Sequence, residues 1–192
     1  MLPLLLASSS PYRRELLSRL RLPFQCASPD IDEARQADED ATSLVRRLAE
    51  QKARALATTH PGHLIIGSDQ VAVLAQQILG KPHDFDRAHQ QLSNASGNSV
   101  TFLTGLALLN TANGHCQVDH VPFTVHFREL DNERITRYLH AEQPYDCAGS
   151  FKAEGLGVSL FRATEGSDAT SLVGLPLIRL VDMLLAEGVQ IP

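Results

Sequence analysis

Apolar residues along this chain occur in two patterns that predict different elements. Short continuous runs are typical of buried strands, whereas apolar residues spaced three and four apart are typical of helices with one buried face. The first pattern predicts strands at residues 4–7, 24–27, 63–73, 100–110, 117–128 and 158–161. The second predicts helices that begin near residues 11, 42, 85, 132 and 177.

Polar residues at the ends of these segments support this division. Ser10 precedes Pro11 at the first helix start, and Thr42 is expected to cap the second helix. Asn113-Gly114 predicts a hairpin, and residues 28–41 are acidic and expected to form a loop. Strands and helices mixed in this order predict a single α/β domain over residues 1–192, with a sheet of mixed strand directions.

Composition and charge narrow the class of partner. The chain has 192 residues, 43% apolar and 20% charged, which is ordinary for a globular protein. The formal net charge of -5 argues against a nucleic-acid polymer as partner, because no overall basic field is present. A mononucleotide needs only a local group of cations and stays compatible with this charge.

Cysteine usage and hydropathy favour the cytoplasm. The three cysteines are far apart and form no C-x-x-C pair, so neither a zinc site nor a disulfide framework is expected. Residues 1–10 have no basic start and too short an apolar run for a secretory signal. No apolar run approaches the length of a membrane span, so we expect no membrane partner.

The first strand leads into a segment that is suited to binding an anion. Three serines from Ser8 to Ser10 precede Pro11, and Arg13 follows in the first turn of the predicted helix. A helix N-terminus presents free backbone N–H groups and positive dipole charge, which favour a phosphate chain. A capped helix with solvated arginines explains the same residues at least as well when this segment is considered alone.

Asp69 is the strongest candidate for chemistry. It follows a strongly apolar predicted strand, and ligands gather at such strand ends in α/β proteins. A carboxylate there can orient water or hold a divalent metal, and Lys52, Lys81 and Lys152 could supply cations. The alternative is an aspartate that caps a turn, and we favour the catalytic interpretation.

Other candidate groups are weaker. Asp30, Asp32 and Glu33 could supply a second carboxylate, but a solvated acidic loop is an equally good explanation. The eight histidines show no metal-binding spacing, and Ser8–Ser10 lie outside any G-x-S-x-G motif, so a serine nucleophile is not expected.

Motifs along nearly the whole chain resemble those of the Maf family of nucleoside triphosphate pyrophosphatases. They recur in the same order at residues 7–17, 32–33, 52–53, 66–69, 80–82, 96–97 with 104–105, 148–152 and 173–176. The resemblance implies an elongated mixed β-sheet flanked by helices with a central cleft, as in inosine-triphosphate pyrophosphatases. It also implies hydrolysis of a nucleoside triphosphate to monophosphate and diphosphate with a divalent metal, Mg²⁺ or alternatively Mn²⁺.

The resemblance also implies roles for individual residues. Asp69 would accept a proton from water, and Glu33 with Asp69 would bind the metal or substrate. The partner would be a small-molecule nucleotide, and homodimer formation is left open. The phosphates would be held by Ser8, Arg13, Lys52, Lys81 and Lys152.

Three further positions resemble the branch of the family that acts on 7-methyl-GTP, namely Tyr12, Gln70 and Glu154. Methylation at N7 makes guanine cationic, and an aromatic face such as Tyr12 attracts a stacked cation. An ionised Glu154 could accept the two donors of the guanine edge. The alternatives are a packing aromatic for Tyr12 and a solvated loop acid for Glu154.

Two other functions stay open from the sequence. One is pyrophosphatase activity on dTTP or UTP within the same family, which a substrate panel would separate. The other is a nucleotide-binding regulator of cell division with little catalysis, and the retained set of candidate catalytic residues favours an enzyme over this alternative.

Overall fold

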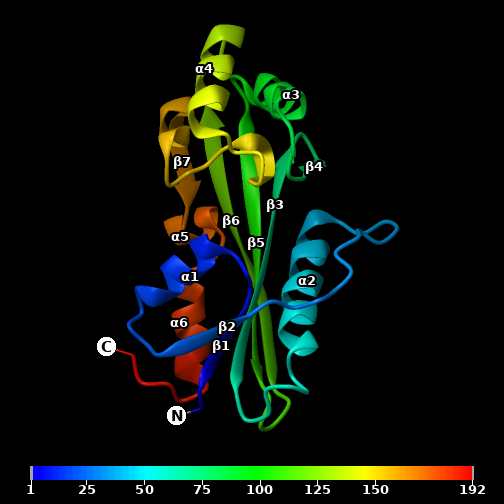
Figure 1. Cartoon of the computed structure of the whole chain (residues 1–192), viewed down its shortest axis with the longest axis vertical. Coiled ribbons are helices and arrows are strands. Elements are labelled where there is room, and N and C mark those ends of the chain that lie inside the picture. The colour runs from blue at the N-terminus through cyan, green and yellow to red at the C-terminus, as the bar shows by residue number, and fades with distance from the viewer. Residues whose placement is uncertain (1, 192) are drawn as a thin grey trace. The chain divides into compact units, whose positions relative to one another are not determined.

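The computed structural model describes residues 2–191 (Figure 1). The chain divides into two compact units, and each is discontinuous in sequence. The first unit contains the chain up to Asp69, Thr104–Val121 and the chain from Gly174 on. The second contains Gln70–Leu103 and Pro122–Val173.

The described residues form a sheet of seven strands, and most of the helices begin where the sequence predicts. The strands are β1 (Leu4–Ala7), β2 (Phe24–Ala27), β3 (Leu64–Leu74), β4 (Gln77–Leu79), β5 (Ser99–Asn110), β6 (Cys116–Phe127) and β7 (Phe161–Gly166). The helices are α1 (Pro11–Ser18), α2 (Ala41–Ala55), α3 (Phe85–Ala95), α4 (Asn132–Glu142), α5 (Ala169–Val173) and α6 (Leu177–Ala186), with 3-10 helices η1 (Ala148–Ser150) and η2 (Leu156–Leu160).

The strand directions are mixed, as predicted. The strands are hydrogen-bonded in the order β2-β1-β3-β5-β6-β7, and β4 pairs with β3. β1 is parallel to both β2 and β3, whereas β4 and β7 are antiparallel to their neighbours. The α/β class with a mixed sheet flanked by helices is therefore confirmed. No helix within residues 2–191 is both long and apolar enough to cross a bilayer.

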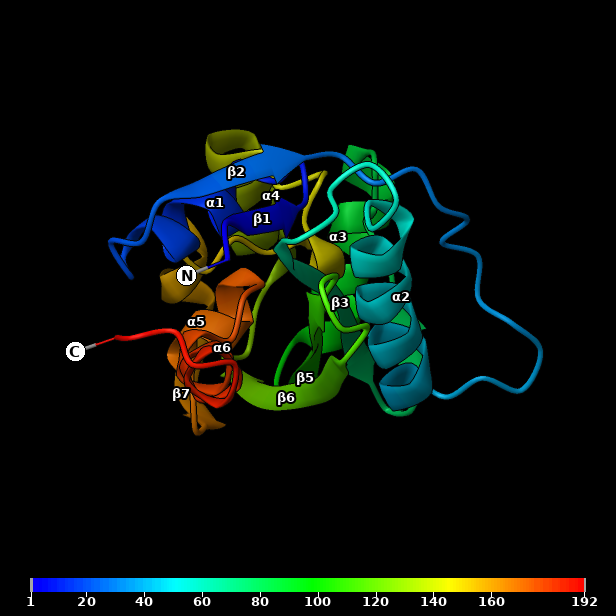
Figure 2. The same cartoon turned by 90° about the horizontal axis from the view of Figure 1, so that it is seen from below.

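In the first unit, α2 packs closely on one face of the sheet, and α1 and α6 lie on the other face (Figure 2). Alternate strand residues face α2, because side chains of a strand alternate between its faces. Two glycines allow the close approach. A Cβ at Gly67 would lie 2.0 Å from the Ala49 carbonyl oxygen, and one at Gly105 would lie 2.1 Å from the Val45 carbonyl oxygen.

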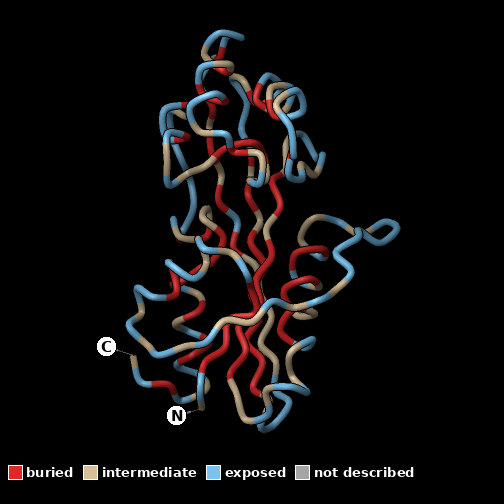
Figure 3. Tube along the Cα trace, viewed as in Figure 1, coloured by how far each residue is buried: buried red, intermediate tan, exposed pale blue. Residues whose placement is uncertain are grey.

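The second unit has a core of its own that is rich in aromatic residues. Phe151 lies at its centre, with ring centroids 5.5 Å from Phe102, 5.7 Å from Phe127 and 5.8 Å from Phe161. Tilted and edge-to-face arrangements at these distances are favourable for aromatic pairs. In both units, the buried segments follow the middle strands of the sheet (Figure 3).

Three local predictions are wrong. Asp69 does not end its strand, because β3 continues for five residues beyond it. Thr42 does not cap α2, because Asp40 is the N-cap and its Oδ1 accepts a 2.7 Å hydrogen bond from the Ser43 N–H. The predicted strand at residues 158–161 is instead mainly η2, and β7 follows it. β7 has mostly exposed side chains, so it has no apolar pattern from which it could be predicted.

Candidate functional site

The first unit brings together three of the residues singled out in the sequence. The Lys52 ammonium lies 2.7 Å from Oδ1 of Asp69 and 2.8 Å from Oε1 of Glu33. Lys52 and Asp69 are 7% and 8% exposed, whereas the Glu33 side chain is 60% exposed. A buried, charge-assisted hydrogen bond thus joins the candidate base to a cation, with a second carboxylate at its solvent side.

The packing of α2 on β3 explains this arrangement. Asp69 lies two positions after Gly67 and therefore faces the same side of the strand, toward α2. Lys52 belongs to the buried face of α2 together with Ala49 and Ala53. Because Gly67 lets the helix backbone approach the strand, the short carboxylate of Asp69 can reach the Lys52 ammonium.

The serine segment has the structure that its sequence predicts. Ser10 is the N-cap of α1, and its side chain accepts a 3.4 Å hydrogen bond from the Arg13 N–H. Ser8 is buried, and its hydroxyl oxygen accepts from the Ser10 N–H at 3.1 Å. The first turn of α1 carries no acidic side chain, so its N-terminus keeps the positive character that an anion prefers.

Arg13 is oriented by a segment that is distant in sequence. Its Nε donates a 2.8 Å hydrogen bond to the Gly174 carbonyl oxygen. The buried Ser68 hydroxyl donates to the carbonyl oxygens of Gly174 and Gly105, both at 2.9 Å. Gly174 has a φ of +118°, a region in which residues with a Cβ are strained. One carbonyl therefore joins Arg13 to the strand residue that precedes Asp69.

The electrostatics of Arg13 support its place beside the carboxylates. Burial lowers the pKa of its guanidinium from the usual value, and the charges of Asp69 and Glu33 oppose that shift. Two carboxylates, an ammonium and a guanidinium therefore act on one another within the first unit. This group contains both the anionic and the cationic residues that a phosphate-cleaving site requires.

The second unit contains the other predicted residues. Lys81 is exposed, and Gln70 is half-buried directly after Asp69 in β3. The Gln70 amide nitrogen donates to the carbonyl oxygens of Ser171 and Leu172, at 2.8 and 3.1 Å. The Gln70 side chain therefore holds α5, and its role in substrate choice stays a prediction.

Lys152 and Glu154 lie in a segment held by α4. The Lys152 ammonium lies 3.4 Å from Oε1 of Glu142, and the Lys152 N–H donates to the Tyr138 hydroxyl at 3.0 Å. Oε2 of Glu142 accepts a 2.6 Å hydrogen bond from the Leu156 N–H. Glu154 itself is exposed. The phosphate-binding role of Lys152 and the base-reading role of Glu154 stay predictions, as does that of half-buried Tyr12.

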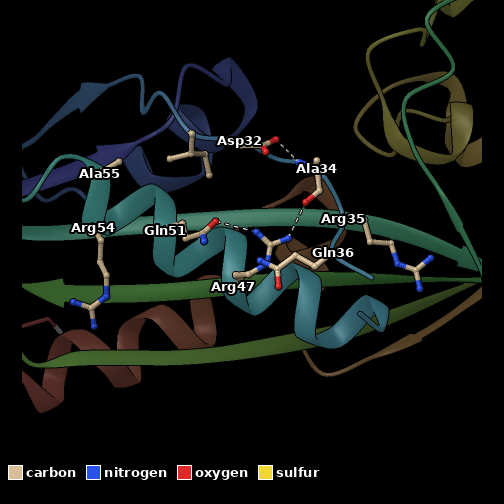
Figure 4. Close-up of a pocket in the computed structure, with 9 residues that line it drawn as sticks. Asp32, Ala34, Arg35, Gln36, Arg47, Gln51, Arg54 and Ala55 are labelled. Carbon is tan, nitrogen blue, oxygen red and sulfur yellow. Dashed lines mark hydrogen bonds between the residues drawn. The ribbon is translucent and has the colours of Figure 1, made fainter. Parts of the chain in front are cut away.

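A cavity of about 680 Å³ lies between α2 and the acidic loop, the segment of residues 28–40 that precedes this helix (Figure 4). Its polar wall includes Asp32, Arg35, Arg47 and Gln51. In Figure 4, the Arg47 guanidinium points from α2 toward the loop, where its Nη2 donates to the Ala34 carbonyl oxygen at 3.0 Å. The cavity therefore borders the loop that carries Glu33.

Glu33 and Asp69 are the residues of this site that could bind a divalent metal. Their carboxylates converge on one cation, the Lys52 ammonium, which shows that this position favours positive charge. Carboxylate oxygens are the donors that Mg²⁺ prefers, and it binds through one or two of them together with substrate phosphates. Within residues 2–191, no three His, Cys, Asp or Glu side chains gather as a metal site. The substrate phosphates would therefore have to supply further ligands.

Two residues of the site region were not anticipated from the sequence, namely Arg47 and Glu39. Their side chains form a two-pronged ion pair, with Nε to Oε1 at 2.6 Å and Nη2 to Oε2 at 2.8 Å. Arg47 lies on the polar side of an amphipathic pattern and Glu39 in an acidic run. Such residues have the same sequence signal as ordinary solvated charges.

Comparison with known proteins shows where this chain belongs. Residues 3–187 match the family described as Maf-like protein. A 7-methyl-GTP pyrophosphatase of Pseudomonas fluorescens is 78% identical over the whole of both chains. Proteins of the same description from Pseudomonas aeruginosa and Alcanivorax borkumensis are 74% and 62% identical, over 98% of this chain and 98% and 96% of theirs. The chain belongs to the Maf family.

Proposed function

We propose that this protein hydrolyses 7-methyl-GTP to 7-methyl-GMP and diphosphate, and so removes a modified nucleotide before it enters nucleic acid. The observation that carries the proposal is the buried contact between Lys52 and Asp69, with Glu33 at its solvent side. The choice of 7-methyl-GTP as substrate is supported by the relatives described as 7-methyl-GTP pyrophosphatases. One of them is 78% identical to this chain over its whole length.

Asp69 is the general base in this proposal. A water oxygen attacks the α-phosphorus, the bond from that phosphorus to the bridging oxygen breaks, and diphosphate leaves. The proton of the water passes to Asp69, which is positioned by Lys52 at 2.7 Å. Because phosphoryl-group chemistry depends mainly on positioning and charge, the rigid packing of α2 on β3 is itself a contribution to the rate.

Cations of the site bind the triphosphate. Arg13, the Ser8–Ser10 segment and the N-terminus of α1 are proposed to bind phosphates. Lys81 and Lys152 are proposed as further phosphate-binding residues. A divalent metal, for which we propose Mg²⁺, would be held by Glu33 and Asp69 and would supply charge neutralisation of the phosphates.

Base selection is assigned to Tyr12, Gln70 and Glu154. Stacking of the methylated, cationic base on Tyr12 contributes about 0.5–2 kcal/mol in general, depending on how far the pair is desolvated. Neutral guanine lacks this cationic attraction. The proposal therefore expects a preference for 7-methyl-GTP over GTP, and over the pyrimidine substrates dTTP and UTP.

Diphosphate release from a panel of nucleotides tests the proposal. We expect 7-methyl-GTP to have the highest kcat/KM and activity to disappear on chelation of divalent metal. Asp69→Asn should abolish turnover without unfolding the protein, whereas Asp38→Asn, a matched loss of charge at an exposed loop position, should retain it. Faster turnover of dTTP and UTP would refute the substrate assignment, and full activity of Asp69→Asn would refute the mechanism.

A further inference from the structure

We propose that Arg47 is a positioning residue for catalysis, because it fixes the acidic loop in the conformation in which Glu33 reaches Lys52. The hydrogen bonds of Arg47 within residues 2–191 go to Ala34, Glu39 and Gln51 and not to Glu33 or Lys52, so Arg47 would act through the loop backbone. This inference rests on the proposed roles of Glu33 and Lys52 in nucleotide hydrolysis.

The position of the Glu33 side chain is not fixed by its own contacts. Its side chain is 60% exposed, although its Oε1 lies only 2.8 Å from the Lys52 ammonium. Because the Glu33 carboxylate is in contact with water, the ion pair is partly screened and does not by itself hold this flexible side chain in one place. The acidic loop also has no helix or strand that would fix its backbone. The position of the Glu33 carboxylate must therefore depend on contacts made by its neighbours.

Arg47 supplies such contacts at two points of the loop. Its Nη2 donates to the carbonyl oxygen of Ala34, the residue directly after Glu33, at 3.0 Å. The same guanidinium forms the two-pronged pair with Glu39, and its Nη1 donates to Oε1 of Gln51 at 3.0 Å. Three groups thus hold this guanidinium, and it in turn joins the loop to α2.

The pair between Arg47 and Glu39 is built as a firm contact. The two side chains are 18% and 8% exposed, in contrast to Glu33. Bidentate arginine–carboxylate pairs are directional, so they restrict orientation as well as distance. Glu39 Oε2 also accepts from the Gln36 N–H at 3.1 Å, and the Arg35 Nε donates to the Glu39 carbonyl oxygen at 2.6 Å. These bonds connect the pair to the rest of the loop.

The helix that carries Arg47 also carries Lys52. Both lie on α2, so the loop is attached to the same rigid element that presents the ammonium. Any movement of the loop relative to α2 changes the distance from Glu33 to Lys52 directly. Supporting residues of this kind, one step removed from the reacting groups, typically change metal affinity or activity 10- to 100-fold when they are replaced.

A double-mutant cycle between Arg47 and Glu33 tests the inference. Arg47→Gln should lower kcat for the nucleotide roughly 10- to 100-fold. In a Glu33→Gln background, the same change should cost less than about twofold, because the group that Arg47 positions has lost its function. Arg46→Gln is the matched control, because Arg46 is the exposed neighbouring residue on α2 and has no contact with the acidic loop in the described hydrogen bonds. Its kcat should equal that of the wild type.

Hydrogen exchange of the backbone amides at residues 32–39 gives a readout that does not need activity. Exchange should be faster in Arg47→Gln and in Glu39→Gln, which breaks the same pair from the loop side, and unchanged in Arg46→Gln. Glu39→Gln also replaces Arg47→Gln in the cycle if the latter fails to fold.

Three results would overturn the inference: wild-type kcat in Arg47→Gln, an equal loss of kcat in both backgrounds, or unchanged exchange of the loop. Absence of wild-type turnover would instead refute the proposed function, and the exchange measurement would still decide whether Arg47 fixes the loop.

Discussion

Gly67→Ala is the substitution for which the structure gives the clearest magnitude. The added Cβ would lie 2.0 Å from the Ala49 carbonyl oxygen, whereas ordinary contact begins at 3.4 Å. The opposing atom belongs to the backbone of α2, so no side-chain rotation can relieve the overlap. Helix and strand must therefore separate by about 1.4 Å, or the strand must deform locally by a similar amount.

The expected loss of stability follows from overpacking. Inserting a methyl group into a packed interior costs about 1–3 kcal/mol, and contact with backbone places Gly67→Ala at the upper end, near 3 kcal/mol. For a protein of this size that corresponds to a fall in Tm of roughly 6–12 °C. Thermal unfolding followed by circular dichroism measures the change.

The same displacement should also reduce activity. Lys52 follows Ala49 by less than one helical turn and moves with it, while Asp69 stays on the strand. A separation of about 1.4 Å would break the 2.7 Å contact between them, and misplacement of this order can cost about 100-fold in rate. Diphosphate release at saturating nucleotide measures kcat at a temperature where the variant is folded.

Gly80→Ala is the matched control for stability, because a Cβ there meets no atom within 4 Å and the backbone φ is not positive. Its Tm should stay within about 1 °C of the wild type, since surface substitutions away from special features change stability little. The reasoning is refuted if Gly67→Ala has the Tm of this control, because α2 would then not rest on the strand as closely as described.

Two further predictions concern the carboxylates that hold loops. The hydrogen bond from Arg47 lowers the pKa of Glu39 from 4.5 to about 2, so carbon-detected NMR should find its titration near pH 2 in the wild type and higher in Arg47→Gln. Because the folded-state pKa is the lower one, the pair stabilises the protein above pH 4.5 and loses this contribution as the pH falls toward 2. An ordinary titration in the wild type would contradict the pairing. Glu142→Gln should raise KM for the nucleotide about fivefold, or about 1 kcal/mol, with little change in kcat. The reason is that the Glu142 carboxylate holds the Lys152 ammonium, which we propose binds phosphate. An unchanged KM would show that Glu142 does not act through Lys152.

Sequence reasoning performed best where local physical rules decide the structure. Ser10 caps α1 and Pro11 begins it, as expected from the preferences of helix ends. The strand at residues 64–74 follows from a single apolar run, although Asp69 lies near its middle and not at its end, where the sequence predicts it. The motifs of the Maf resemblance include both Lys52 and Asp69, and the structure places these side chains 2.7 Å apart. Their roles in catalysis stay predictions.

Prediction from the sequence failed where a structure depends on contacts between distant residues, or where a segment has no apolar pattern. β7 is an exposed, polar strand, and it exists because it pairs with β6 rather than because of its own pattern. The pair of Arg47 with Glu39 joins two ordinary surface residue types across a loop. Aspartate and threonine both suit the N-cap of a helix, so the sequence alone does not decide whether α2 begins after Asp40 or after Thr42. In the structure Asp40 is the N-cap.

The Gly174 carbonyl, which accepts from both Arg13 and Ser68, has a consequence for the order in which the protein forms. A ribosome makes the chain from its N-terminus, so Lys52 and Asp69 emerge long before Gly174 does. Until then, Arg13 and Ser68 lack their common acceptor, and α6 is absent from the first unit. The nascent chain therefore contains Arg13, Lys52 and Asp69, which we propose for the nucleotide site, before it contains the segment that orients Arg13. Binding of nucleotide in its final geometry can begin only when synthesis has passed the last segment of the first unit.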